Sequence, residues 1–205
     1  MHGVWAEDVR DFADVAKTTQ DFNAFALFRN GFTTALTADG SAIFSTHTLI
    51  GGGTQSNAGT AQLTPTSLNT GLVNLVEQKN QAGVIMGNTP SVLLVPPALW
   101  KHAREITDSA LIADLANNNI NVYRSALGLT VWTSNFLGAV AGGSDTAWFL
   151  LATRHGFTRL IRQGIETALT PWQYSNNLTY RYQANYREAY FCADYAGSYG
   201  STGVA

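Results

Sequence analysis

The stretch Ser91-Val-Leu-Leu-Val-Pro-Pro-Ala-Leu-Trp-Lys-His-Ala-Arg-Glu-Ile106 decides the fold of this chain. Its first part, Val92–Val95, is a short apolar run that predicts a buried strand, and the two prolines after it stop that strand. The following residues place Leu99, Ala103 and Ile106 on one face of a helix, which a proline in the first turn favours. The stretch therefore predicts a strand, a sharp turn and a helix.

Residues 4–30 form the longest helix candidate. Two apolar stripes flank the polar segment Lys17–Asp21: Trp5, Val9, Phe12 and Ala16 before it, and Phe22, Phe25, Phe28 and Phe32 after it. Either two helices meet at this segment, or one long helix changes the partner that it faces. Asn30-Gly31 predicts the C-terminal stop.

A second helix is predicted to start with Thr64 as N-cap and Pro65 in the first position. Its apolar face consists of Leu68, Leu72, Leu75 and Val76. Before it, Leu49–Ala61 is rich in Gly, Ser, Thr and Asn and predicts an exposed loop. Ala38-Asp-Gly-Ser41 predicts a turn between short apolar pieces.

Later segments predict further elements. Asp108–Leu115 predicts a short helix. Apolar and other residues alternate over Leu127–Trp132, which predicts a strand. Ala147–Ala152 is a continuous apolar run, which predicts a strand buried on both faces. Leu178–Arg187 alternates apolar and polar residues, which predicts a strand with one packed and one solvated face, and Tyr190–Tyr195 can extend it. The end, Gly197–Gly203, is expected to be too glycine-rich for a regular element.

The composition bounds the class of protein. A length of 205 residues is typical of one domain, which can have two lobes. Apolar residues make up 45% of the chain, enough for a sizeable core. No apolar run reaches the roughly 20 residues of a membrane span, and the start does not resemble a signal peptide. The single cysteine, Cys192, excludes an internal disulfide framework and any cysteine-based zinc site.

Charged residues are scarce. They make up 13% of the chain, about half of the usual quarter. One interpretation is a compact fold with a neutral polar surface. The other is that much of the surface meets other subunits, because the cores of interfaces are depleted in charge. The net charge of −2 argues against a dedicated nucleic-acid binder.

No constellation of residues predicts an enzyme, a cofactor site or a metal site. His102 and Glu105 are three apart on a helix, but no second ligand pair joins them, so a surface ion pair is the better interpretation. Gly51–Gly53 lacks the lysine and the directly following helix of a phosphate-binding loop. The Tyr/Arg alternation of 178–187 fits packing tyrosines better than a stacking platform for single-stranded nucleic acid.

Several segments, taken together and in their order along the chain, resemble those of a known protein family. They are residues 4–32, Ala42-Ile-Phe-Ser-Thr-His47, Gly51-Gly-Gly-Thr-Gln-Ser-Asn57, Leu63–Gln78, Ser91–Ile106, Leu129–Ser134, Ala147–Leu151 and Arg181–Gly200. The series resembles the Mu-like head subunits, which are tailed-phage major capsid proteins of the Hong Kong 97-type fold. The resemblance covers nearly the whole chain.

The resemblance implies an α+β fold with a long spine helix. It implies a peripheral lobe, residues 1–83 and 158–205, that holds this helix, and an axial lobe, residues 84–157. Relatives carry an N-terminal arm and an extended loop before the spine helix, and this chain is expected to lack both. We therefore expect no Lys–Asn isopeptide cross-link, because the lysine of that bond lies in the extended loop.

The implied function is structural: self-assembly, through hexamers and pentamers, into the icosahedral head of a phage or prophage around double-stranded DNA. Implied partners are other copies of the chain, and further a scaffold, a maturation protease and a portal, with no membrane and no cofactor. The protein is expected in the virion capsid after synthesis in the cytoplasm of the bacterial host. Expected assembly contacts lie in two segments: Gly51, Gly52, Gly53 and Asn57, and Asn117, Asn118 and Asn119.

Two alternatives stay open beside the phage head. The first is a nanocompartment shell of the same fold, encapsulin-like, which encloses enzymes instead of DNA. The second is a single-strand nucleic-acid-binding module that uses the Tyr/Arg strand. An enzyme ranks last, because no catalytic residue can be assigned.

Overall fold

The computed structural model describes residues 2–109, 121, 128–170 and 181–204. The chain folds into two compact units. The first comprises Met1–Phe25 and Thr158–Phe191, and the second comprises Ala26–Phe157 and Cys192–Ala205. Both units contain helix and strand, so the predicted α+β class is confirmed at that level.

Helix α1 (His2–Arg29) is one continuous helix, which decides between the two interpretations of its polar middle. The hydroxyl groups of Thr18 and Thr19 donate to the backbone carbonyls of Asp14 and Val15, one turn earlier, at 2.8 Å each. Such bonds satisfy threonine hydroxyls inside a helix, so the polar segment need not break it.

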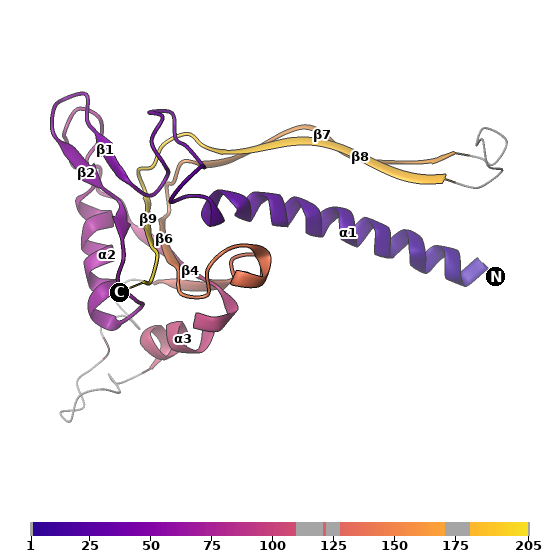
Figure 1. The fold of residues 1–205 in the computed structure, drawn as a ribbon, viewed down its shortest axis with the longest axis horizontal. Helices are drawn as coiled ribbons and strands as arrows, with labels where there is room; N and C mark the ends of the chain where they lie inside the picture. Colours follow the sequence, from indigo (N-terminus) through magenta and orange to yellow (C-terminus); the bar gives the residue numbers. More distant parts are fainter. Residues whose placement is uncertain (1, 110–120, 122–127, 171–180, 205) are drawn as a thin grey trace. The chain divides into compact units, whose positions relative to one another are not determined.

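In the first unit, strands β7 (Phe157–Thr170) and β8 (Arg181–Cys192) pair as a two-stranded sheet. Helix α1 runs along this pair (Figure 1), and the ring of Phe12 meets that of Tyr182 edge to face, with centroids 5.5 Å apart. The predicted strand is thus confirmed from Arg181, while 178–180 lie outside the described residues. Strand β7 was not predicted, because Leu160 and Ile161 are adjacent and both exposed, so no period of two exists there.

In the second unit, a mixed sheet has the strand order β3-β9-β6-β4-β5. Its strands are β3 (Ala58–Gly59), β9 (Ser198–Ser201), β6 (Trp148–Ala152), β4 (Pro90–Val95) and β5 (Thr130–Thr133). Strand β6 is antiparallel to both neighbours, whereas β4 and β5 are parallel, as are β3 and β9. All five residues of β6 are buried, as the apolar run predicted.

Two helices pack on this sheet, α2 (Pro65–Glu77) and α3 (Trp100–Asp108) (Figure 1). Their buried side chains join those of the strands in one core: Leu68, Leu72 and Leu75 of α2, Ala103 and Ile106 of α3, Leu93 and Val95 of β4, and Trp148 and Leu150 of β6. Thr64 is the N-cap of α2, as predicted, and the structure adds a capping box with Ser67. Val76 was assigned to the buried face wrongly: it is exposed, because it lies one residue beyond Leu75 on the turn.

The segment Ser91–Ile106 has the predicted strand, turn and helix. Strand β4 ends at Val95, and Pro96 continues extended at φ −68° and ψ 163°. A short 3₁₀ turn, η1 (Pro97–Leu99), leads into α3. The helix predicted over Asp108–Leu115 lies mostly outside the described residues.

The glycine-rich end is a correction. The sequence was expected to form no regular element there, yet β9 is a fully buried strand between β3 and β6. A side chain on Gly200 would meet the ring of Phe44, because a Cβ atom there would lie 2.7 Å from its Cγ. Gly200 fits in this strand because its missing side chain lets the ring of Phe44 approach the backbone.

The predicted loop Leu49–Ala61 is a second correction. Strand β1 (Thr46–Thr48) pairs with β2 (Thr54–Ser56) as an antiparallel hairpin, and β3 follows directly. The predicted loop character is found at the exposed hairpin turn, Ile50–Gly53, with Gly52 and Gly53 at positive φ, and at Thr60–Ala61. The strands were not predicted because β1 and β2 consist of polar residues and β3 has only two residues, Ala58 and Gly59.

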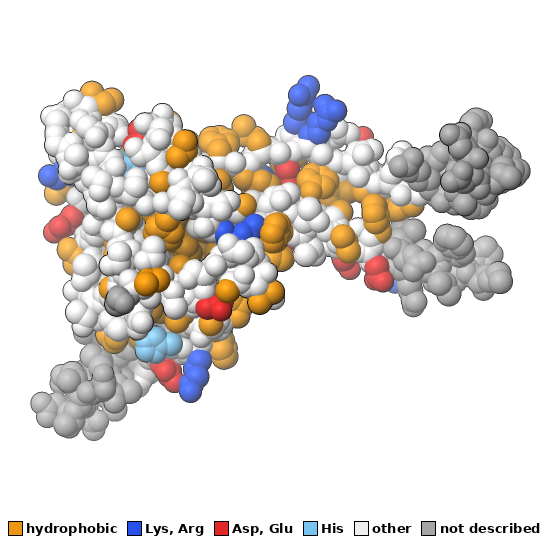
Figure 2. Space-filling model, viewed as in Figure 1, with side chains coloured by type: hydrophobic (Ala, Val, Ile, Leu, Met, Phe, Trp, Pro, Cys, Tyr) orange, Lys and Arg blue, Asp and Glu red, His pale blue; other side chains and the backbone are white. Residues whose placement is uncertain are grey.

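The surface matches the composition. Figure 2 shows few acidic or basic side chains on the visible face, scattered among neutral polar and apolar ones. Within the described residues, no helix combines the length and the apolarity that crossing a bilayer requires.

Candidate functional site

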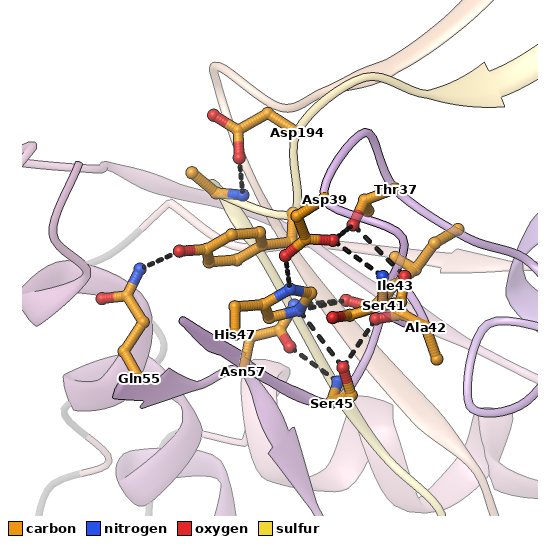
Figure 3. A network of polar contacts seen from close by, with 12 residues as sticks. Thr37, Asp39, Ser41, Ala42, Ile43, Ser45, His47, Gln55, Asn57 and Asp194 are labelled. Atoms are coloured by element: carbon orange, nitrogen blue, oxygen red, sulfur yellow. Dashed lines mark hydrogen bonds and ion pairs between the residues drawn. The ribbon is translucent and has the colours of Figure 1, made fainter. Parts of the chain in front are cut away.

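A buried polar cluster surrounds His47, the middle residue of β1 (Figure 3). Its imidazole is fully buried and stacks on the ring of Tyr195, with centroids 3.6 Å apart and planes 5° apart. Nδ1 of the imidazole lies 2.6 Å from Oδ2 of Asp39. The cluster thus joins the turn before β1 to the segment after β8.

Asp39 accepts further hydrogen bonds. The hydroxyl of Thr37 and the backbone N–H of Ser41, at 2.9 Å, both donate to its Oδ1 (Figure 3). Partial burial pushes the pKa of Asp39 up, but the hydrogen bonds from Thr37, His47 and Ser41 outweigh it and lower the pKa below its usual value. Asp39 is therefore held as a carboxylate that fixes the imidazole.

The other imidazole nitrogen faces a second acceptor. Nε2 of His47 lies 3.3 Å from the carbonyl oxygen of Ile43. Both ring nitrogens therefore face oxygen atoms of the protein. The arrangement is a buried His–Asp pair stacked against an aromatic ring.

Ser45, His47 and Asp39 have the connectivity of a catalytic triad, with the Ser45 hydroxyl 3.5 Å from Nε2. The geometry does not support that role. The ring is fully buried, and the Ser45 hydroxyl donates at 2.8 Å to the carbonyl of Ala42. A nucleophile needs a free hydroxyl that a substrate can reach. We interpret the cluster as structural.

The predicted contact residues lie in different environments. Gly51, Gly52 and Gly53 form the exposed tip of the β1–β2 hairpin. Asn57 is buried: its Nδ2 donates to the Ile43 carbonyl at 2.8 Å, and its Oδ1 accepts from the Ser45 N–H at 3.1 Å. In this structure, the Asn57 side chain supports the cluster around His47 from within. Asn117, Asn118 and Asn119 lie outside the described residues.

The surface histidine of α3 has the environment that its spacing favoured. Nδ1 of His102 lies 3.8 Å from Glu105, and Nε2 lies 2.8 Å from the carbonyl of Leu63. Both nitrogens have protein partners, as in an ordinary surface ion pair. Among the described residues, no group of three or more His, Cys, Asp or Glu side chains is placed to hold a metal ion.

Two of the three tyrosines of β8, Tyr182 and Tyr190, have partners within the first unit. Tyr182 contacts Phe12 of α1, and the Tyr190 hydroxyl donates at 2.7 Å to Glu188. Glu188 also accepts two bonds from the Arg159 guanidinium of β7, at 2.7 and 2.9 Å. Burial, the bond to Glu188 and the charge of Glu188 raise the pKa of Tyr190 to about 12. These contacts favour packing over a stacking platform for nucleic acid.

The cluster around His47 was not predicted. Tyr195 lies far along the chain from Asp39 and His47, so no local spacing joins all three. One signal was available: His47 stands between Thr46 and Thr48 at the inward position of an alternating strand. A histidine on an inward face predicts a partner nearby, and Asp39 in the preceding turn was the nearest carboxylate.

The comparisons with known proteins identify the family. Among curated proteins, none matches this chain. A family model described as phage capsid protein matches residues 1–200. That match covers nearly the whole chain, and it confirms the resemblance to phage capsid proteins. Such proteins are structural components of the virion. On this match, the chain belongs to the phage capsid protein family.

Proposed function

We propose that this chain is a major capsid subunit that assembles with copies of itself into the icosahedral head around phage double-stranded DNA. The observation that carries the proposal is the family match over residues 1–200. The Hong Kong 97-type fold and the Mu-like subfamily are part of this proposal and rest on the segment order 4–32, 42–57, 91–106 and 181–200.

The elements of the structure suit that fold. Helix α1 would be the spine helix, with the β7–β8 pair beside it in the peripheral lobe. Strands β4, β5 and β6 of the mixed sheet, with α3, would belong to the axial lobe, whereas β3 and β9 would belong to the peripheral lobe. The lobe boundaries, 1–83 with 158–205 and 84–157, remain a prediction, and the two compact units divide the chain at other residues.

The charge distribution supports a shell subunit. Between Asp39 and Lys101, the only Asp, Glu, Lys or Arg residues are Glu77 and Lys79. A shell subunit must offer broad neutral faces to its neighbours, because charge at the core of an interface must be desolvated. A chain whose middle carries two charges of opposite sign fits that need.

The proposal also covers the partners of the chain and the compartment in which it assembles. Copies of the chain would form hexamers and pentamers, and a scaffold, a maturation protease and a portal would act on the assembling shell in the host cytoplasm. Gly51, Gly52, Gly53, Asn57, Asn117, Asn118 and Asn119 remain proposed assembly contacts; for Asn57, the contact would use backbone or neighbouring atoms, since its side chain is buried.

The contents of particles test the function. The full chain is expressed in bacteria with the rest of its phage or prophage genes, and particles are isolated by sedimentation. After nuclease treatment, we expect protected double-stranded DNA inside the particles. Particles that hold a protein cargo and no protected DNA would contradict the phage-head proposal in favour of a nanocompartment.

A further inference from the structure

Two adjoining turns form a small protrusion of the second unit. One is the β1–β2 turn, Leu49–Gly53, and the other is Asn80–Met86, which follows α2; together we name them the double turn. The backbone N–H of Gly51 donates to the Gln81 carbonyl at 2.8 Å, and that of Ile50 donates to the Gln81 side chain at 3.3 Å. The two turns are therefore fixed to each other.

The second turn is also held internally. Oδ1 of Asn80 accepts from the backbone N–H groups of Ala82 and Val84, both at 3.0 Å. An antiparallel bridge joins Lys79 to Ile85, and the Met86 N–H donates to the Gln78 carbonyl at 2.9 Å. The double turn therefore presents its side chains on an ordered backbone.

Those side chains are apolar and face outward. Ile50 is 89% exposed, Val84 62%, Ile85 59% and Met86 45%. Turns normally carry polar residues, and a cluster of exposed apolar side chains on ordered turns is typical of a contact surface. Figure 2 shows apolar side chains at this end of the second unit.

Among the described residues, the charges that lie beside this surface are mostly acidic. Glu77 and Lys79 line a pocket with Gly52 and Gly53 of the first turn, and Asp39 and Asp194 line another with Gln81 of the second. A nucleic acid would need cations here, and an anionic membrane surface would need several. A neutral, apolar partner of matching character is a second copy of the same charge-poor chain.

We propose that the double turn is a self-association surface of this chain, covered in the shell by a second copy. The inference rests on the proposed function, because it assumes that copies of the chain meet. The contact would be driven by apolar burial, so it would be nearly independent of salt. Fixed turns lower the entropic cost of forming it.

Charge insertion tests the surface. Ile50→Asp and Ile85→Asp place a carboxylate on it, and Val140→Asp makes the same kind of change at a fully exposed residue elsewhere in the second unit. Self-association of the full chains is measured by sedimentation over a range of concentrations, with circular dichroism as the check of folding. We expect each double-turn variant to weaken association about tenfold or more, and Val140→Asp to change it little.

The outcomes separate this inference from the proposed function. A wild-type chain that stays monomeric at every concentration would overturn both. A wild type that assembles, with double-turn variants that assemble equally well, would overturn this inference alone. If Val140→Asp weakened self-association as much as the double-turn variants do, this inference would also be overturned, because the effect would then follow from a charge added anywhere.

A cross-link gives a second measurement that does not depend on a disruptive variant. A photoreactive amino acid replaces Ile50, and the assembled chain is irradiated and digested. We expect adducts that join position 50 to a peptide of another copy, distinguished by mixing isotopically light and heavy chains. Adducts within one chain only, in particles that form normally, would overturn the inference.

Discussion

The imidazole of His47 lies parallel to the phenol ring of Tyr195, 3.6 Å from it between centroids, while Asp39 holds the edge of the imidazole. The pair joins β1 to the segment that leads into β9, so it links two parts of the second unit that are remote in the chain. An aromatic ring over a paired imidazole combines apolar burial with an electrostatic contact. We expect this cluster to stabilise the unit.

Removing the ring of Tyr195 tests that role. Tyr195→Ala should lower the free energy of unfolding by about 3–5 kcal/mol, because a fully buried ring leaves a cavity beside His47. Tyr195→Phe keeps the ring and loses only the bond from Gln55 to its hydroxyl, so it should cost about 0.5–1.5 kcal/mol. Denaturant unfolding measures both; equal costs would show that the ring contact contributes nothing.

The lowered pKa of Asp39 predicts that the stability of the fold falls at acid pH. Its pKa is lower in the folded chain than the unfolded value of about 3.9, so its stabilisation is complete above that value and is lost as the pH falls through the folded pKa. Asp39→Asn should cost about 1.5–3 kcal/mol at pH 7, and the difference from wild type should shrink below pH 4. Unfolding measured from pH 7 to pH 3 checks this, and a constant difference would contradict a stabilising role of the Asp39 carboxylate.

Gly200 should not tolerate a side chain. A Cβ atom there would lie 2.7 Å from Phe44 and 3.1 Å from Phe149, so Gly200→Ala should destabilise the second unit by about 1–3 kcal/mol. Gly164→Ala is the matched control in β7, because no atom lies within 4 Å of a Cβ there, and it should be neutral or slightly stabilising. Thermal unfolding measures both variants, and equal shifts would contradict the close packing.

The β7–β8 pair depends on a carboxylate that is itself buried. The Glu188 side chain is 3% exposed and is bound by Arg159 and Tyr190. Arg159→Ala should weaken hydrogen-exchange protection of the strands, because it leaves a buried carboxylate without its cation. Adding Glu188→Gln to that variant should restore part of the protection. A double variant less protected than Arg159→Ala would contradict this explanation.

Local rules predicted much of the fold. Val92–Val95, the two prolines and the helix after them were predicted because proline acts on its own neighbours. Helix α2 followed from Thr64 and Pro65, and β6 from its unbroken apolar run. In each case, the residues that set the structure lie inside the element or next to it.

Distant partners explain what was not predicted. Strand β9 exists because it pairs with β3 and β6, and its glycine permits contact with Phe44 from another part of the chain. The site follows the same rule. Asp39, His47 and Tyr195 carry no joint spacing, so only the folded chain brings them together.

Electron microscopy of the purified full chain, stained in its assembled state, tests the central claim most directly. A capsid subunit that forms a shell with copies of itself should give closed particles, or rings and sheets built of one repeating unit. A uniform monomer at every concentration and ionic strength, with its folded state intact, would contradict the account.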